Sequence, residues 1–253
     1  MLDAWIAVAL RWDVLVAWMA LAVITAFTLT RITAPYGRHA RRGWGPALPA
    51  GWSWMVMESV SSIMVLACFI SSPHRSAEAW AFVGIFCAHY AYRSLVYPFL
   101  GAANASNVPL SISAMASAFN LINGTVIGAA LFGTADGPPE LSISMFLGGI
   151  LVGAGFTTHV WADSVLRRLR VENGPGYHVP KGGLFRYVSC PNYLGEIVQW
   201  VGFAWMTMSL GGVCFAVWTV ANLAPRAAAH HRWYRAHFPE YPPERKALVP
   251  MLY

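Results

Sequence analysis

The sequence is poor in charge. Only 11% of its 253 residues are Asp, Glu, Lys or Arg, whereas 57% are hydrophobic. Average soluble domains carry about 25% charged residues. A soluble chain could not bury so much apolar surface, and exposed apolar patches of that size promote aggregation. The shortage of charge therefore excludes an ordinary soluble domain and indicates an integral membrane protein.

Several sequence motifs are also missing. The four cysteines, Cys68, Cys87, Cys190 and Cys214, are dispersed, so neither a zinc site nor a disulfide framework is expected. The sequence contains no GxGxxG motif after a strand, no P-loop and no Ser-His-Asp pattern. A bound nucleotide would have to be held by helix ends rather than by a Rossmann domain. We expect no metal, no nucleic acid and no obligate protein partner.

Long apolar runs are what the sequence has instead. A membrane-spanning helix needs about 20 apolar residues. We expect seven such helices, over residues 12–31, 51–72, 79–100, 110–133, 141–166, 193–209 and 211–229. Only the break expected at Gly211–Gly212 divides the last two ranges. The sequence thus predicts an all-α integral membrane protein, with residues 1–253 forming a single membrane domain.

The basic residues predict the orientation of the chain. Of the 17 Lys and Arg residues, 14 lie in the loop after the first range, the loop after the fifth range, or the C-terminal tail. The opposite side carries only Arg11 and Arg75, and Arg93 lies within a range. Cytoplasmic loops of membrane proteins carry an excess of Lys and Arg. We therefore expect the N-terminus outside and the C-terminus in the cytoplasm.

Polar residues recur at helical spacing on four of the apolar ranges, which places them on common helix faces. An ionised group at membrane depth costs at least ~2.5–3.5 kcal/mol, so such residues usually pair with one another or serve a function. The aligned residues are Glu58 in the second range; His89, Tyr90, Arg93 and Tyr97 in the third; His159, Asp163, Arg167 and Arg170 from the fifth; and Arg226, His230 and Tyr234 from the last.

Two of these groups allow more than one interpretation. Glu58 is either the counter-ion of Arg93, the hydrogen-bond partner of Tyr90, or a structural buried carboxyl. Asp163 either pairs with Arg167 within the helix or accepts hydrogen bonds from a ligand while Arg170 meets a phosphate. The basic end of the last range would also suit anionic lipid headgroups.

The segment KGGLFRYVSCPNYLGE, from Lys181 to Glu196, carries the strongest signal. It places Arg186, Asn192 and Glu196 at the start of an otherwise apolar helix. The C-terminal segment RAAAHHRWYRAHFPEYPPERKALVPMLY adds arginine, histidine and aromatic side chains. Together these segments predict a pocket at the cytoplasmic face for a charged ligand that contains rings.

These segments, together with FCAHYAYRSLVYPF, resemble the steroid 5α-reductase family over about Tyr36 to Tyr253. The pattern GGLF-x-YVS-x-x-N-[YF]-LGE followed by HHR-x-Y is specific. The resemblance implies a seven-helix membrane enzyme that uses NADPH to reduce the Δ4 double bond of a 3-oxo steroid. It implies that Glu58 and Tyr90 bind the ketone oxygen. Met57 stands where animal members have Gln, and His159 where the family often has Asn.

The resemblance also implies which residues surround the ligands. Those expected at the cofactor are Arg38, His159, Asp163, Arg170, Tyr177, Asn192, Glu196, Arg226, His230 and Tyr234. Those expected to line the substrate site are position 53 (Ser53, between Trp52 and Trp54), Met57, His89 and Arg93. The substrate would be a lipophilic, steroid-like molecule that enters from the bilayer.

The proposed chemistry suits these residues. Hydride addition to the β-carbon of an enone develops charge on the carbonyl oxygen, and a tyrosine hydroxyl oriented by Glu58 could stabilise it. Two rivals stay open: a membrane methyltransferase of the isoprenylcysteine or phospholipid type that uses S-adenosylmethionine, and a sterol or lipid carrier without enzymatic activity. A compact chain of this kind fits a bacterial inner membrane or an endoplasmic reticulum.

Overall fold

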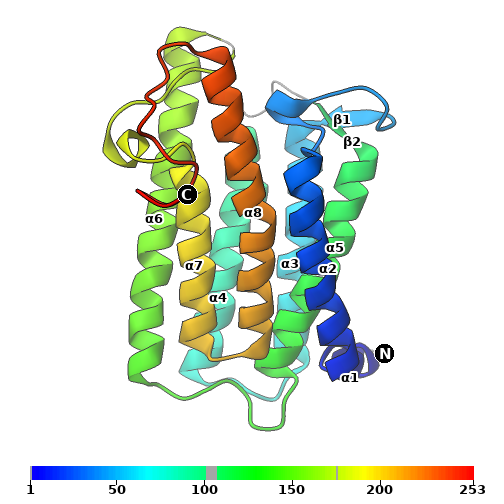
Figure 1. Cartoon of the computed structure of the whole chain (residues 1–253). Coiled ribbons are helices and arrows are strands. Elements are labelled where there is room, and N and C mark those ends of the chain that lie inside the picture. Colours follow the sequence, from blue (N-terminus) through cyan, green and yellow to red (C-terminus); the bar gives the residue numbers. More distant parts are fainter. Residues whose placement is uncertain (1, 101–106, 175) are drawn as a thin grey trace.

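A computed structural model describes residues 2–100, 107–174 and 176–253, and Figure 1 shows a bundle of long helices running side by side. Two short strands, β1 (Ala47–Pro49) and β2 (Asn107–Pro109), pair antiparallel at one end. The α-helices are α1 (Leu2–Ala9), α2 (Trp12–Arg31), α3 (Ala50–Ser71), α4 (Ala77–Ala91), α5 (Leu110–Phe132), α6 (Ile143–Asn173), α7 (Pro191–Thr207) and α8 (Leu210–His237).

Four helices, α2, α3, α5 and α6, are long and apolar enough to cross a membrane. A spanning helix needs about 20 residues, whereas α4 has 15 and α7 has 17. A π-helical turn (Tyr92–Val96) and a 3-10 turn (Tyr97–Phe99) extend α4. The four helices indicate a multi-pass membrane protein. Seven spans and the orientation of the termini stay predictions.

Two boundaries differ from the sequence-based expectation for physical reasons. The chain does not turn at Gly211–Gly212; it turns at Met208, whose φ of 44° is left-handed, and Ser209 caps α8 by accepting a hydrogen bond from the Gly212 amide. Gly211 lies inside α8, where a side chain would be too close to α5: a Cβ there would come 2.8 Å from the Val126 carbonyl oxygen. It serves close helix packing instead of a turn.

The other differences concern polar helix ends. Helices α6 and α8 continue to Asn173 and His237, beyond the expected ends at residues 166 and 229. Their last turns are polar, so hydropathy alone does not reveal them. The short helix α1 was not expected either.

Glycines bring α6 and α7 into close contact. A Cβ at Gly195 would lie 2.6 Å from the backbone nitrogen of His159 and 2.7 Å from the Gly155 carbonyl oxygen. A Cβ at Gly155 would in turn collide with the backbone of Gln199. This glycine seam sets His159 and Asp163 of α6 directly beside Asn192 and Glu196 of α7.

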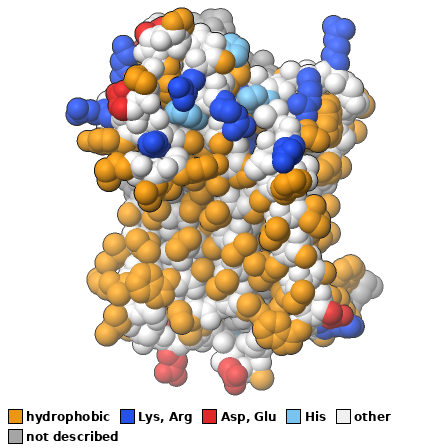
Figure 2. Space-filling view, viewed as in Figure 1, with side chains coloured by type: hydrophobic (Ala, Val, Ile, Leu, Met, Phe, Trp, Pro, Cys, Tyr) orange, Lys and Arg blue, Asp and Glu red, His pale blue; other side chains and the backbone are white. Residues whose placement is uncertain are grey.

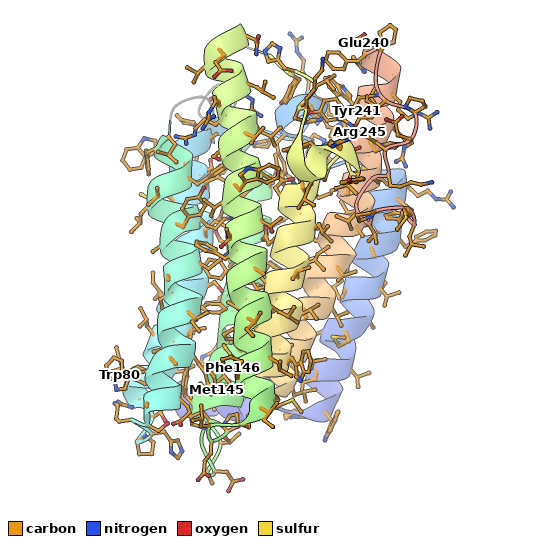
Figure 3. All side chains as sticks on the ribbon, turned by 90° about the vertical axis from the view of Figure 1, so that its left-hand side faces the viewer. Trp80, Met145, Phe146, Glu240, Tyr241 and Arg245 are labelled. Atoms are coloured by element: carbon orange, nitrogen blue, oxygen red, sulfur yellow. The ribbon has the colours of Figure 1, made fainter. Side chains whose placement is uncertain are left out.

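Side chains sort by type along the bundle. On the face shown in Figure 2, hydrophobic side chains cover the middle, Lys, Arg and His gather toward the upper end, and acidic side chains lie at the lower edge as well as at the upper left. In Figure 3, Trp80, Met145 and Phe146 lie at the lower end, whereas Glu240, Tyr241 and Arg245 of the tail lie at the upper end. The upper end, where the basic side chains gather, is called the basic end of the bundle.

Candidate functional site

A cavity of about 610 Å³, called the large cavity, lies at the basic end of the bundle. Its wall combines the loop after α2, the π-helical and 3-10 turns after α4, the polar halves of α6 and α8, the loop before α7, and the start of α7. All ten residues expected at a cofactor line it: Arg38, His159, Asp163, Arg170, Tyr177, Asn192, Glu196, Arg226, His230 and Tyr234. Segments far apart in sequence thus meet around one space.

The glycine seam determines the polar floor of this large cavity. Asn192 Nδ2 donates to Asp163 Oδ1 at 3.0 Å. His159 Nδ1 lies 3.3 Å from the Asn192 carbonyl oxygen and 3.7 Å from Glu196 Oε2. His159 and Asp163 are buried. Asp163 therefore pairs with Asn192 across the seam, and no ion pair between Asp163 and Arg167 is found in the part of the chain that the structure describes.

Arg38 is held in an aromatic cage beside the cavity. Its guanidinium carbon lies 4.6 Å from the ring centres of both Tyr177 and Tyr234 and 5.0 Å from that of Trp233. Its Nη1 is buried and has no hydrogen-bond partner among the described residues. The rings hold the cation in place, and Nη2 donates to the Tyr234 hydroxyl at 3.5 Å, but Nη1 is left without an acceptor in the part of the chain described. The cage therefore presents a positioned cation that can take an anionic group.

Two lining residues were missed by the sequence reasoning. His39 stacks on His230 at 5.1 Å, with its Nε2 3.1 Å from His230 Nδ1, and the Tyr193 hydroxyl lies 3.1 Å from His230 Nε2. Burial, followed by the charges of Arg38 and Arg226, lowers the pKa of His39 to about 4. His39 is therefore neutral near pH 7. Its position next to Arg38 in sequence was the available signal.

The smaller cavity, of about 130 Å³, lies among α3, α4, α5 and α8. Its wall includes Glu58, Tyr90, Met57 and Arg93, as expected for a substrate site, together with apolar side chains. Seven residues line both cavities: Tyr36, Trp54, Arg93, Val108, Glu196, Leu223 and Arg226. The two spaces therefore meet at a wall that contains two arginines and a glutamate.

The Glu58 carboxylate is the counter-ion of Arg93. Arg93 Nη2 lies 3.0 Å from Glu58 Oε1, and both side chains are largely buried. Arg93 is the second residue of the π-helical turn, and such turns often mark functional sites. Of the alternatives left open by the sequence, the structure favours the ion pair. Tyr90 is 4% exposed and lines the small cavity together with Glu58, so both side chains can contact the same ligand there.

Two of the expected substrate residues lie elsewhere. His89 is buried with its Nδ1 3.0 Å from Gln199 Oε1, and it is not among the described residues that line either cavity. Ser53 is likewise buried outside both walls as described, whereas its neighbour Trp54 lines both cavities. A helix turns by about 100° per residue, so neighbours in sequence face different directions.

The C-terminal tail, residues 238–253, is hydrogen-bonded to the segment that precedes α7. The Ser189 hydroxyl lies 2.6 Å from His231 Nδ1 and 2.7 Å from the Tyr241 hydroxyl. The Ser189 and Cys190 amides donate to the carbonyl oxygens of Lys246 and Ala247. These bonds fix the residues just before Asn192. They explain why the segment before α7 and the tail carry one joint signal in the sequence.

Comparison with known proteins points to one family. A family model described as 3-oxo-5-alpha-steroid 4-dehydrogenase matches residues 106–253. The chain is 39% identical over 241 residues to the steroid 5-alpha-reductase DET2 of Gossypium hirsutum, covering 92% of this chain and 93% of that protein. It is 38% identical over 240 residues to the 3-oxo-5-alpha-steroid 4-dehydrogenase 1 of Bos taurus, again covering 92% and 93%. These relatives come from a plant and a mammal, so they lend no support to a bacterial origin.

Proposed function

Because the chain belongs to the 3-oxo-5-alpha-steroid 4-dehydrogenase family and is therefore an oxidoreductase, we propose that it uses NADPH to reduce the Δ4 double bond of a 3-oxo steroid or a similar lipid enone. A hydride would add to the β-carbon and a proton to the α-carbon. The observation that carries this proposal is the pair of cavities with a common wall, one polar and cationic, the other lined by Glu58 and Tyr90.

The large cavity suits a dinucleotide phosphate. Arg38, with its buried Nη1 unpartnered among the described residues, offers a cation for a phosphate. Arg170, near the Tyr177 ring at 5.5 Å, offers another. Asn192 and Glu196 can hydrogen-bond the carboxamide and ribose next to the shared wall. The nicotinamide, when bound, supplies the hydride, and these residues orient it.

The small cavity suits the enone end of the substrate. An ionised carboxylate has only acceptors, so Glu58, paired with Arg93, cannot donate to a carbonyl oxygen. Tyr90 can donate, and charge that develops on the oxygen strengthens that bond. Glu58 would hold the carbonyl end indirectly, by orienting Tyr90 and placing the positive charge of Arg93. At about 130 Å³ the cavity is below the roughly 300 Å³ of usual ligand pockets, so the helices must part slightly for a four-ring lipid.

The rival functions fit these residues less well. A methyl transfer needs no hydrogen-bond donor aimed at a carbonyl inside the bundle, whereas Tyr90 lines the small cavity. A lipid carrier has no use for the cationic large cavity next to it. Neither rival requires two cavities that share Arg93, Glu196 and Arg226.

A steady-state assay of the purified protein tests the function. We expect oxidation of NADPH that depends on a Δ4-3-oxo steroid, with the saturated 3-oxo product and a smaller rate with NADH. S-adenosylmethionine serves as the competing donor. Methyl transfer without steroid reduction, or tight steroid binding without turnover, would overturn the proposal in favour of one rival.

We also propose that the enzyme crosses the membrane seven times, with the N-terminus outside and the large cavity facing the cytoplasm, where NADPH is available. The support is the basic end of the bundle, where Arg38, Arg170 and the tail gather. A reporter fused after Tyr253 should be active only in the cytoplasm. Activity restricted to the outside would rule out this topology.

A further inference from the structure

Helices α3 and α5 pack side by side, and glycines of α5 bring them into close contact (Figure 1). Asn120, Gly124 and Gly128 follow one another at four-residue intervals, which places them on one face of α5. A Cβ at Gly124 would lie 2.7 Å from the Ser61 carbonyl oxygen of α3, and one at Gly128 would lie 2.7 Å from Cys68 Cβ. The spacing between the two helices is therefore fixed one turn away from Asn120.

The Asn120 side chain crosses this contact and has no role in the function proposed so far. It is 5% exposed and lines the small cavity together with Glu58 and Tyr90. Its Nδ2 donates to the Met57 carbonyl oxygen of α3 at 2.6 Å. Because Met57 directly precedes Glu58 in α3, the amide of Asn120 is held next to the backbone that carries the Glu58 carboxylate.

The same amide also acts on the Glu58 carboxylate. A side-chain amide nitrogen carries two N–H groups, and the bond to the Met57 carbonyl oxygen uses one of them. Asn120 and Arg93 are both side chains whose hydrogen bonding acts on the Glu58 carboxyl group. Arg93 Nη2 donates to Glu58 Oε1 at 3.0 Å. Glu58 is therefore held from two sides, by a cation of the π-helical turn and by an amide of α5.

A second buried asparagine of α5 serves a different contact. Asn123 is 1% exposed, and its Oδ1 accepts a hydrogen bond from Trp18 Nε1 of α2 at 3.1 Å. It is not among the described residues that line either cavity. Asn123 therefore provides a matched comparison: the same residue type, buried on the same helix, with a partner on α2 instead of α3.

We propose that Asn120 is a positioning residue for the chemical step, which holds the Glu58 carboxylate in the orientation that serves Arg93 and Tyr90. One hydrogen bond from Arg93 leaves the plane of a carboxylate free to turn, whereas a second donor on another helix fixes it. Asn120 would thus act on the carbonyl end of the substrate through Glu58, without contact to the reacting atoms. This inference rests on the proposed function and adds a residue of α5 to it.

Asn120→Leu removes the amide and keeps a branched side chain of similar shape. Its kcat with androst-4-en-3-one should fall about tenfold, the effect of a lost hydrogen bond to a charged group. The KM for NADPH should stay the same, because Asn120 is not among the described residues that line the large cavity. In a Glu58→Gln background the further loss should be less than about twofold, since the carboxylate that Asn120 holds is absent. Asn123→Leu is the control and should keep kcat.

Thermal unfolding of the same purified variants separates this inference from the proposed function. The shifts in midpoint caused by Asn120→Leu and Glu58→Gln should not add, whereas those of Asn123→Leu and Glu58→Gln should. Non-additive shifts in a protein that reduces no steroid would refute the reductase and leave the contact between Asn120 and Glu58 standing. Asn120→Ala takes the place of the leucine variant if that variant does not fold.

Two results would overturn the inference while the reductase stands. One is an unchanged kcat in folded Asn120→Leu. The other is a loss of kcat that multiplies fully with the loss caused by Glu58→Gln, which would mean that Asn120 supports only the packing of α5 on α3.

Discussion

The two cavities differ in how the chain builds them. The large cavity draws its charged side chains from loops and from helix ends, and it fixes them through cross-links such as Asn192 to Asp163 and the tail to Ser189. The small cavity draws on helices inside the bundle and has one buried ion pair, Arg93 to Glu58. The comparison teaches that cofactor binding and the chemical step should be separable by mutation.

Tyr90→Phe gives the largest expected effect. Loss of one oxyanion donor costs about 10²–10³ in kcat, while the affinity for NADPH should stay the same because Tyr90 lies outside the large cavity's wall as described. Steady-state kinetics measures kcat, and an equilibrium binding assay measures the affinity for NADPH. Tyr187→Phe, on an exposed side chain, is the control. Near-normal turnover of folded, NADPH-binding Tyr90→Phe would eliminate this mechanism.

Glu58→Gln sharpens the same result. It keeps the shape of the side chain but leaves the Arg93 guanidinium without its counter-ion, so kcat should also fall sharply. If Glu58 acts through Tyr90, the double variant should lose much less than the product of the two single losses. A purely structural Glu58 would instead lower the yield and the thermal stability, and its effect on kcat would multiply with that of Tyr90→Phe.

Asn192→Ala and Glu196→Ala should weaken the binding of NADPH about 10- to 100-fold, the range of a lost hydrogen bond to a charged group. Turnover at saturating NADPH should fall too, because the ring is less well oriented. Asn192→Ala should leave steroid affinity unchanged. Isothermal titration with NADPH is the direct measurement. Unchanged affinity and turnover in both variants would contradict the assignment of the large cavity.

Gly195→Ala tests whether the glycine seam holds the large cavity together. The new methyl group would press on the His159 backbone, and overpacking of this kind typically destabilises by about 1–3 kcal/mol. We expect a lower unfolding midpoint and weaker NADPH binding. Gly153→Ala, on the neighbouring helix α6 and with open space at its Cβ, is the control. Equal stability of the two variants would show that the seam can relax.

Arg38→Ala should weaken NADPH binding about tenfold, as expected for one charge-assisted contact to a phosphate, and added salt should reduce the difference. Arg42→Ala, on an exposed side chain of the same loop, is the control. The ratio of NADPH to NADH affinity locates the contact. A loss confined to NADPH would indicate the 2′-phosphate, and an equal loss for both would indicate the diphosphate.

The smallest expected effect concerns pH. The pKa of His39 falls from 6.5 to about 4 in the folded protein because of burial and the nearby arginines. Between these values the unfolded chain binds more protons, so the free energy of unfolding rises with pH. The unfolding midpoint should be flat above about pH 6.5 and fall below it. In His39→Gln that fall should be shallower; an identical pH profile would refute the role of His39.

The sequence predicted the apolar helices well, because a spanning helix leaves a long apolar run. It predicted α2 at Trp12–Arg31, the range expected. It placed the turn at Gly211–Gly212 wrongly, because a glycine that permits close packing and a glycine that permits a turn are identical in sequence. The polar ends of α6 and α8 were missed because hydropathy decreases there while the helix continues.

The site followed a similar division. The ten residues at the large cavity were expected because the chain resembles the family. The segment from Lys181 to Glu196 and helical spacing had singled out eight of them independently, whereas Arg38 and Tyr177 rested on the resemblance alone. His39 and Tyr193 were missed because they act through His230, which lies about 190 residues from one and 37 from the other. His89 was assigned to the substrate site because it shares a helix face with Arg93. The π-helical turn that follows His89 disturbs that face, and no sequence pattern revealed it.

The π-helical turn at Tyr92–Val96 constrains how this chain can change in length. A π turn accommodates one more residue than an α-helix over the same rise. Deleting one residue within it would let α4 continue as a regular helix and would leave Tyr97, which lines the large cavity, on the same face. Deleting one residue from the regular part of α4 would instead rotate the side chains that follow by about 100°. Insertions and deletions are usually tolerated in loops and excluded from helices. The π turn is therefore a place inside a helix where a one-residue change in length would leave the cavity wall in position.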